Sequence, residues 1–404
     1  MTSSTNGHSS TNPQLVDFDI HGLVGIRLIN PSSSDVAAVT EQLGPLRSPL
    51  SREPDIIVRF VECLATPRLR YLGLQQDGFT DDGFFLLQSK KKETKVRIDF
   101  EQIGEQCEIV CQSGLPRIPL LTAILNLLVL KKDCVALHAS AFVYNGIGVL
   151  VTGWAKAGKT EALLAFAVHG AEYIGDEWVL LSGDGQKMYG VPESIHLWDW
   201  HLDYLPDVRS RVRREELLLF KRIHWIDKMQ QKISSGTVGK LLPVKYLRSA
   251  MPALRRQLHV TMKPQTIFNS TLGTLQAKPD KIFLMMNHQD TTVSVEPNDP
   301  LTITNQMISS IRYEQLPFMS HYLAFKFAFP EKRNEFIENS DKLQYDILRR
   351  ALAGKEAYTV WHHYPFSFHE LFERMRPFCE AIAEPSGHGR DVDVKQEYGW
   401  LDSR

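Results

Sequence analysis

The sequence predicts an α/β core, preceded by an α+β accessory domain and followed by a helical region. Three observations lead to this expectation. A glycine-rich loop at residues 153–160 follows an apolar, β-rich run and precedes a stretch of strong helix formers. Short strand-like runs separated by turns come before the loop. Stretches with helical spacing come after residue 300.

The composition is typical of a globular protein without membrane spans or a disulfide framework. The chain has 404 residues, a net charge of −1 and 43% hydrophobic residues. Its five cysteines are scattered and odd in number, so a reducing, cytoplasmic location is predicted. Cys107 and Cys111 have no second pair of ligands at zinc-site spacing, which argues against a metal site there. The apolar stretch 118–130 is too short to span a bilayer and predicts a buried helix started by Pro119.

The accessory domain is expected over residues 16–131. A polar segment at 1–15 precedes it, which is expected to be disordered and lacks the apolar centre of a signal peptide. Runs rich in β-formers and bounded by turn residues predict strands at 56–60, 84–88, 95–100 and 107–111. No cluster of chemically reactive residues stands out in this domain.

The core opens with a predicted β-hairpin. The dipeptide Asn-Gly at 145–146 separates two β-rich runs, and this dipeptide is the strongest short hairpin signal. If it forms the turn, Tyr144 faces Ile147. Continuing the ladder places His138 opposite Gly153. The sequence therefore predicts an antiparallel partner for the strand that enters the loop, and a histidine beside the first glycine of the loop.

The glycine-rich loop has the spacing of a phosphate-binding loop, in which successive N–H groups turn inward around phosphates. Lys159 is expected to reach the β- and γ-phosphates and Thr160 to hold Mg²⁺, so ATP and Mg²⁺ are predicted to bind. A helix expected over 160–169 and closed by Gly170 points its positive end at the anion. The alternative is a glycine-rich turn without a ligand. The expected nucleotide-contacting residues are Gly153, Trp154, Ala155, Lys156, Ala157, Gly158, Lys159, Thr160 and Glu161.

Two adjacent carboxylates are expected to return to the level of the loop. The helix carries the chain roughly 15 Å away, and a strand at 171–175 brings it back about 16 Å, to Asp176 and Glu177. A carboxylate there can bind Mg²⁺, and a second can accept the proton of an attacking hydroxyl. The pattern indicates Thr160, Asp176 and Glu177 as metal ligands and the two acids as catalytic residues. A polar turn is the alternative.

These residues resemble the catalytic domain of HPr kinase/phosphorylase and its relatives. The resemblance covers residues 135–185 and includes the run Leu-His-Ala-Ser at 137–140, the loop continued by Glu161, the short helix and the acidic pair. It implies a nucleotide-binding architecture shared with phosphoenolpyruvate carboxykinase, and transfer of phosphate from ATP to a hydroxyl. By matching position, it also implies that His138 lies near the transferred phosphate and belongs to the catalytic set.

The chain departs from that family in three ways. The family usually has two aspartates where this chain has Asp-Glu, and smaller or polar residues at Trp154 and Lys156. Its Glu-x-Arg-Gly-Leu-Gly segment is replaced by Glu-Ser-Ile-His-Leu-Trp-Asp-Trp at 193–200. The resemblance therefore implies kinase chemistry on a hydroxyl of a peptide, a protein serine or a small molecule, rather than on HPr. A nucleotide-binding regulator or ATPase switch is the alternative, but it would not need the acidic pair.

A basic segment at 206–263 interrupts the core, which is expected over 132–300. It holds fourteen Lys and Arg against four acids, in a chain whose charges nearly cancel. Such a segment attracts an anionic acceptor, with Arg255-Arg256 as the candidate contact because the pair lies just before a β-like run at 259–262 that could anchor it to the core, or is a solvated insertion. If it is solvated, Trp198 and Trp200 are expected to recognise the acceptor. Nucleic acid is not expected, because aromatic residues are few and no binding motif occurs.

The remaining chain is expected to form two core strands and then helices. The strands, at 281–287 and 291–296, are expected to be neighbours. Adjacent His362 and His363 cannot share one face of a strand or helix, which argues against a metal site. Association of the chain with copies of itself is left open. The helical region is expected over 301–385, with helices at 304–312, 319–329 and 333–352, a C-cap at Gly354 and a polar tail at 386–404.

Overall fold

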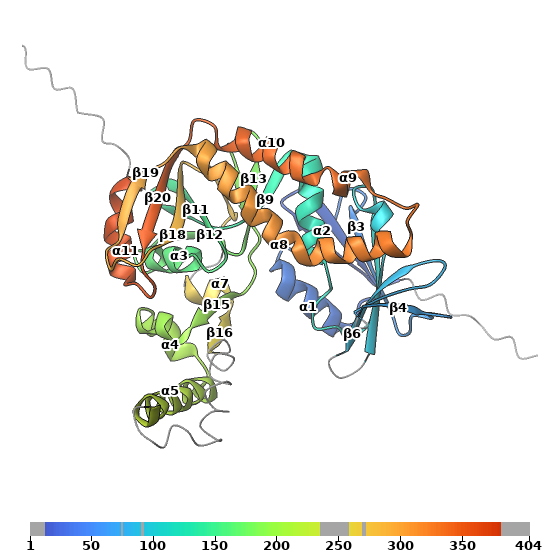
Figure 1. Cartoon of the computed structure of the whole chain (residues 1–404), viewed down its shortest axis with the longest axis horizontal. Helices are drawn as coiled ribbons and strands as arrows, with labels where there is room; N and C mark the ends of the chain where they lie inside the picture. Colours follow the sequence, from blue (N-terminus) through green and yellow to red (C-terminus); the bar gives the residue numbers. More distant parts are fainter. Residues whose placement is uncertain (1–12, 74–75, 90–92, 235–257, 269–271, 381–404) are drawn as a thin grey trace, which may run out of the picture.

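The computed structural model describes residues 13–73, 76–89, 93–234, 258–268 and 272–380. Two lobes lie side by side, and the long helix α8 (Pro300–Ala328) runs across both (Figure 1). The expected polar tail at 386–404 and the pair Arg255-Arg256 lie outside the described residues. So do residues 1–12 of the expected disordered N-terminus, whereas Leu15 already begins the first strand.

The N-terminal lobe is a mixed sheet of eight strands in the order β1-β2-β3-β8-β7-β6-β5-β4. The four strands predicted here are confirmed, with ends that differ by one or two residues. The strands are β1 (Leu15–Ile20), β2 (Val24–Ile29), β3 (Ile56–Val61), β4 (Arg70–Leu72), β5 (Asp77–Phe79), β6 (Phe84–Ser89), β7 (Glu93–Ile98) and β8 (Cys107–Gln112).

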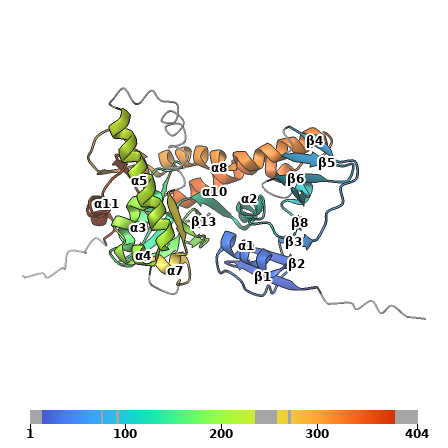
Figure 2. The same ribbon diagram turned by 90° about the horizontal axis from the view of Figure 1, so that it is seen from below.

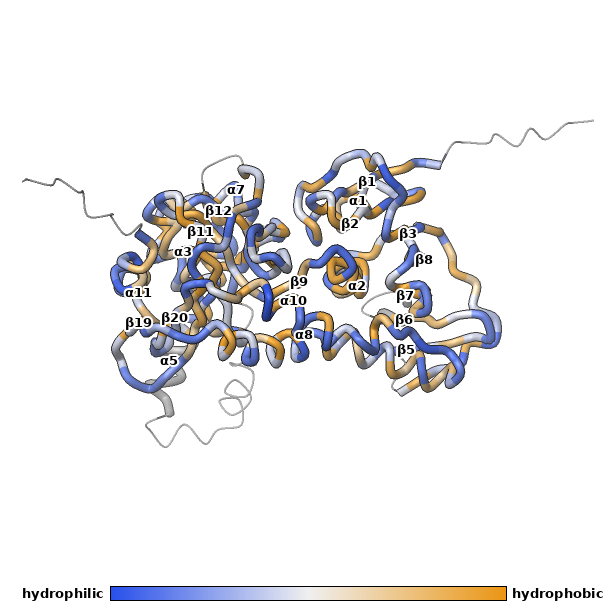
Figure 3. Tube along the Cα trace, turned by 90° about the horizontal axis from the view of Figure 1, so that it is seen from above, coloured by the Kyte–Doolittle hydropathy of each residue, from blue (hydrophilic) through white to orange (hydrophobic). Residues whose placement is uncertain are grey.

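Two helices of the N-terminal lobe contribute to its core. Helix α1 (Ser33–Leu43) begins with a capping box between Ser32 and Asp35. Helix α2 (Leu121–Leu128) is largely hydrophobic and lies between the two lobes (Figure 3). It starts after Leu120, which has a left-handed φ of 59°, so Pro119 precedes the helix rather than starting it.

The core sheet of the second lobe has six strands in the order β12-β10-β11-β18-β20-β19. Successive residues of a strand point to opposite faces of the sheet, so alternate side chains contact the helices on one face or the other. Phe283 and Met285 of β18 face α3 and α11, whereas Ile282 and Leu284 face α8. The elements are β10 (Ser140–Tyr144), β11 (Ile147–Gly153), β12 (Glu172–Gly175), β18 (Lys281–Asn287), β19 (Ser294–Pro297), β20 (Glu356–His362), α3 (Lys159–Ala167) and α11 (Phe368–Met375).

The predicted hairpin forms, but its first strand is shorter than expected. Tyr144 pairs with Ile147 as predicted, and the ladder ends at Ser140 opposite Val151. The expected pairing of His138 with Gly153 is wrong. At Ala139 the chain leaves the core sheet, because its N–H donates to the carbonyl oxygen of Glu177 at 3.2 Å.

His138 therefore ends a separate strand of a second, smaller sheet. This strand, β9 (Cys134–His138), pairs antiparallel with β13 (Trp178–Ser182), and His138 lies opposite Trp178. The sheet continues through β14 (Met188–Gly190) to β17 (Gln276–Ala277). The break at Ala139 thus places the histidine beside the acidic pair rather than beside the first glycine.

The C-terminal part differs from expectation in three respects. The helices expected at 304–312 and 319–329 form one helix, α8, which continues through Pro317. Beyond α8 the chain forms strand β20 in addition to helices, and this strand was not predicted. It lies between β18 and β19, so the two strands expected to be neighbours are separated. Helices α9 (Glu335–Glu338) and α10 (Ser340–Leu352) follow α8, and Gly354 has the expected positive φ after α10.

The basic segment projects from the core lobe (Figures 1 and 2). Its described part comprises α4 (Pro206–Arg211), α5 (Arg214–Ser234) and β16 (His259–Met262), and α7 (Pro264–Ile267) follows directly. Strand β16 pairs with β15 (Ile195–Trp198) and so ties the segment to the core. Among the described residues, no helix is long and apolar enough to cross a membrane.

Candidate phosphate-binding and catalytic site

The loop between β11 and α3 is shaped by its two glycines. Gly153 has φ 151° and Gly158 has φ 99°, a region that L side chains rarely adopt. A Cβ on Gly158 would lie 3.1 Å from Nε2 of His362. The same Nε2 lies 2.8 Å from the carbonyl oxygen of Ala157, so β20 supports the loop from behind. His362 is therefore a packing residue of the loop.

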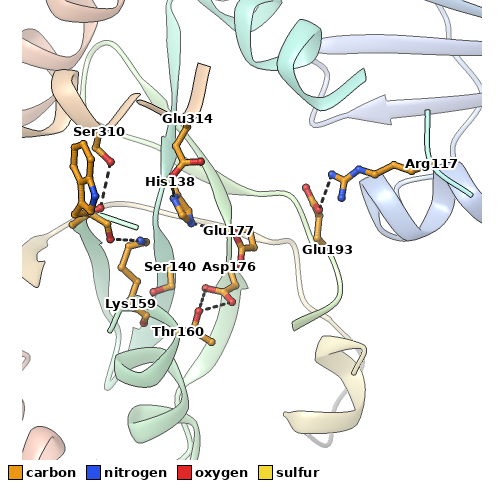
Figure 4. Close-up of polar contacts among 12 residues, drawn as sticks. Arg117, His138, Ser140, Lys159, Thr160, Asp176, Glu177, Glu193, Ser310 and Glu314 are labelled. Atoms are coloured by element: carbon orange, nitrogen blue, oxygen red, sulfur yellow. Dashed lines mark hydrogen bonds and ion pairs between the residues drawn. The ribbon is translucent and has the colours of Figure 1, made fainter. Parts of the chain in front are cut away.

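Lys159 lies inside the loop rather than on the surface. Its ammonium group donates to the carbonyl oxygen of Trp154 at 2.9 Å (Figure 4). Burial lowers the pKa of Lys159, against the raising effect of the charges on Glu177 and Asp176. The hydroxyl of Ser140 donates to the carbonyl oxygen of Lys159 at 2.6 Å and ties the start of α3 to β10. The lysine is thus held close to where phosphates would enter the loop.

The carboxylate of Asp176 meets the hydroxyl of Thr160, as the chain geometry predicted. Thr160 Oγ1 lies 3.0 and 3.2 Å from the two carboxylate oxygens (Figure 4). Asp176 is buried behind Thr160. Burial raises the pKa of Asp176 above its ordinary range, and the negative charge of Glu177 is the second-largest cause of this increase. A cation beside the Thr160 hydroxyl would relieve this unfavourable charge.

His138 lies between two carboxylates. Its Nε2 is 3.1 Å from Oε2 of Glu177, and its Nδ1 is 2.8 Å from Oε1 of Glu314. Burial acts to lower the pKa of His138, but the two hydrogen bonds outweigh burial and raise it. Burial likewise acts to raise the pKa of Glu177, but the contact with His138 lowers it. The array therefore favours an imidazolium ion that holds an ionised Glu177.

Glu314 is a site residue that the sequence analysis missed. It lies on α8, and the hydroxyl of Ser310, one turn earlier, donates to the carbonyl oxygen of Gly153 at 3.4 Å (Figure 4). Both residues therefore face the loop from the same helix side, as residues four apart do. No sequence pattern linked this helix to the loop. Only the Ser-x₃-Glu spacing could have suggested a shared polar face.

A cavity of about 1070 Å³ opens in front of the loop. Among the expected nucleotide-contacting residues, Ala155, Lys156, Gly158, Lys159, Thr160 and Glu161 line it, whereas Gly153, Trp154 and Ala157 do not. His138, Glu177 and Glu314 line its inner end, and Asp176 does not reach its surface. The two adjacent acids therefore lie in different places: Glu177 faces the cavity, and Asp176 lies behind Thr160.

The outer end of the cavity is rich in aromatic rings. Trp198, Trp200, Tyr313 and Tyr364 line it, together with His224 of helix α5. The carboxylate of Glu161 lies 3.3 Å from Nε2 of His201 and accepts from the Tyr364 hydroxyl at 3.4 Å, so it anchors this wall. Flat rings of this kind suit a nucleobase or an acceptor with an apolar face.

The oxygens of Thr160 and Asp176 fit a nucleotide that brings its own Mg²⁺. Among the described residues, no cluster of three His, Cys, Asp or Glu side chains is arranged to hold a metal ion. Mg²⁺ is commonly bound by one or two protein groups, with phosphate and water oxygens completing the shell. The adjoining oxygens of Thr160 and Asp176 meet that requirement.

Comparison with protein-family models finds no match for the sequence, and comparison with curated proteins finds none either. The functional interpretation therefore depends on the geometry of this site and on the residues that form it.

Proposed function

We propose that the chain is an HPr-kinase-like phosphotransferase that moves the γ-phosphoryl group of ATP to a hydroxyl acceptor. The observation that carries the proposal is the joint position of two groups in one cavity. A glycine-rich loop with Lys159 and Thr160 lies at one side, and the Glu177–His138–Glu314 array lies at the other. Phosphoryl transfer depends mainly on positioning and on charge stabilisation, and these groups can supply both.

The loop side binds and orients the nucleotide in this proposal. The N–H groups of the loop and the start of α3 face the phosphates, and Lys159 moves from the Trp154 carbonyl to a phosphate oxygen. Thr160 and Asp176 would hold Mg²⁺, which would neutralise charge on the phosphate oxygens. The burial of Asp176 makes this place unfavourable for an uncompensated carboxylate, and so favours occupation by a cation.

The opposite side acts on the acceptor. Of the two adjacent acids, Glu177 lines the cavity and Asp176 does not, so Glu177 is the one that accepts the proton of the acceptor hydroxyl. His138 orients Glu177 and places a positive charge beside the transferred group. Glu314 holds the second nitrogen of His138 and fixes the ring. The aromatic end of the cavity, with Trp198 and Trp200, is where the rest of the acceptor would lie.

The second candidate function is a nucleotide-binding switch that transfers nothing. The loop alone would serve it. Against it stands the Glu177–His138–Glu314 array, because a site that only binds nucleotide does not need two glutamates in contact with one histidine.

Incubation with γ-labelled Mg·ATP tests the proposal. Water, free hydroxy amino acids, serine peptides and the chain itself serve as acceptors, and the label is followed by chromatography. We expect label in at least one hydroxyl acceptor other than water, and its loss in Glu177→Gln. A chain that binds ATP but leaves the label in ATP, or releases it only as inorganic phosphate, under all these conditions would be a switch.

A further inference from the structure

A second cavity, of about 210 Å³, lies where the two lobes meet. Helix α2 forms one wall, α8 and α10 form another, and β9 and β13 of the small sheet contribute the base. It is separate from the large cavity, although Glu314 lines both. None of the residues that the proposed phosphate chemistry uses, apart from Glu314, lies on its walls.

Three buried polar side chains that line this cavity each have one oxygen atom without a hydrogen-bond partner. Thr122 and Asn126 lie four residues apart on α2, and Gln344 lies on α10. They are 8%, 6% and 2% exposed, respectively. The unpartnered atoms are Oγ1 of Thr122, Oδ1 of Asn126 and Oε1 of Gln344. The other buried residues of α2 are leucine or isoleucine, so these two are a polar stripe on an apolar helix.

Such an arrangement needs a polar occupant. Buried polar atoms in folded proteins are nearly always hydrogen-bonded, and three exceptions around one cavity are not expected by chance. One buried water needs about 10 to 15 Å³ on the same measure, so a cavity of about 210 Å³ is much larger than a single-water site. Its size and its unpartnered groups together indicate a small molecule that forms several hydrogen bonds.

Charged groups on the walls narrow the class of molecule. Arg117 contributes a guanidinium group whose side chain is 60% exposed and whose contact with Glu193 is long, at 3.7 Å (Figure 4). Glu314 contributes a carboxylate. Asn126 and Gln344 line the same cavity, and their side-chain oxygens can accept hydrogen bonds. We propose that this cavity binds a free amino acid, with its carboxylate toward Arg117 and its ammonium group toward the amide oxygens and Glu314.

The position of Glu314 connects this site with the phosphate site. Its Oε1 lies 2.8 Å from Nδ1 of His138, and Trp178 of the second cavity lies 5.9 Å, centre to centre, from the same ring. An ammonium group near Glu314 would compete with His138 for that carboxylate. The proposal that the cavity binds an amino acid does not depend on the proposed function. An effect of the bound amino acid on phosphoryl transfer does rest on the proposed function.

Calorimetric titration of the full chain without nucleotide, with each proteinogenic amino acid in turn, tests the site. We expect one-to-one binding of at least one amino acid. Thr122→Val removes the hydroxyl at nearly constant shape, and Gln344→Met removes the amide. Each should weaken binding by about tenfold or more, because a group of the ligand loses its partner. Thr304→Val is the matched control, because Thr304 is also a buried helix threonine but lies outside the cavity and donates to the carbonyl oxygen of Pro300.

Three outcomes would overturn the inference. They are no binding by any amino acid, equal binding by the wild type and both cavity variants, or an equal loss in the Thr304→Val control. The methyl ester of the bound amino acid adds a check on orientation: it should bind the wild type more weakly than the free acid, and Arg117→Gln should remove that difference.

The test also separates this inference from the proposed function. Lys159→Ala should keep amino-acid binding, because Lys159 lines only the large cavity. If the wild type binds an amino acid but not ATP, the kinase assignment is refuted and the second site is not. ATP binding without amino-acid binding would refute the second site alone.

Discussion

The hydroxyl of Thr160 lies 3.0 Å from the carboxylate of Asp176, sixteen residues later in the chain. The contact exists because α3 carries the chain away from the loop and β12 returns it to the same level. It places two oxygen groups of the kind that Mg²⁺ prefers beside the N–H groups of the glycine-rich loop. Glu177, the next residue, faces the cavity instead. Two adjacent carboxylates therefore have two distinct environments.

This division predicts different defects for two matched substitutions. Glu177→Gln should slow phosphoryl transfer by about 10² to 10⁴, the usual value of general-base assistance, with the Mg²⁺ requirement unchanged. Asp176→Asn should raise the Mg²⁺ concentration needed for half-maximal rate, because it weakens a metal ligand. Initial rates over a Mg²⁺ series measure both effects. The assignment fails if the two variants show the same Mg²⁺ dependence as each other.

Glu314 is predicted to control the protonation of His138. Its hydrogen bond helps to raise the histidine's pKa, so Glu314→Gln should lower that pKa. A histidine whose pKa is raised on folding stabilises the folded protein at pH values below its ordinary pKa. This stabilisation is lost as the pH rises through the raised pKa. NMR titration of the ring protons gives the pKa directly. An unchanged value in Glu314→Gln would show that Glu177 alone sets it.

Buried Glu193 is predicted to make stability fall as pH rises. Its Oε1 has no partner, Arg117 is 3.7 Å from Oε2, and burial raises the carboxyl pKa from 4.5 to about 7. Below pH 4.5 the group is protonated in both states. Above pH 4.5 the carboxyl group ionises first in the unfolded chain. The free energy of unfolding therefore falls by on the order of 2 to 3 kcal/mol by pH 8.

Urea unfolding of Glu193→Gln at pH 4.5 and pH 8 checks this prediction. The variant should match the wild type at the lower pH and exceed it at the higher one. Glu331→Gln, at an exposed glutamate, is the control. A gain in stability that is equal at both pH values would point to a cause other than ionisation.

Gly158→Ala is predicted to damage both stability and nucleotide binding. The backbone has φ 99°, and the new methyl group would lie 3.1 Å from Nε2 of His362, which supports the loop. We expect a loss of about 1 to 3 kcal/mol in the free energy of unfolding and at least a tenfold loss of ATP affinity. Gly146→Ala is the control: its φ is 79°, but no atom lies within 4 Å of the added carbon. It should lose stability and keep ATP affinity.

Elements set by local patterns were predictable from the sequence. The Asn-Gly turn predicted the hairpin with Tyr144 opposite Ile147, and the spacing of helix and strand predicted the approach of Asp176 to Thr160. Both depend on chain geometry within about forty residues. The identity of β18 followed from its apolar run in the same way.

Features set by distant packing were not predictable. Glu314 reaches His138 from 176 residues away, and only the packing of α8 on the core sheet brings them together. Strand β20 lies within a region of helical spacing and pairs with β18 seventy-five residues earlier, as Lys281 with Glu356 shows. The break at Ala139 also had no local signal, because the whole run 135–143 is β-forming.

The binding of Mg·ATP to the loop is the claim on which the account depends most. Calorimetric titration of wild type, Lys159→Ala and the exposed control Lys187→Ala measures it directly. We expect Mg·ATP to bind the wild type and Lys187→Ala alike, and Lys159→Ala to lose most of that affinity while keeping its melting temperature, because the buried ammonium group is the charged phosphate contact. Equal affinity in Lys159→Ala, or no binding by the wild type, would contradict the account.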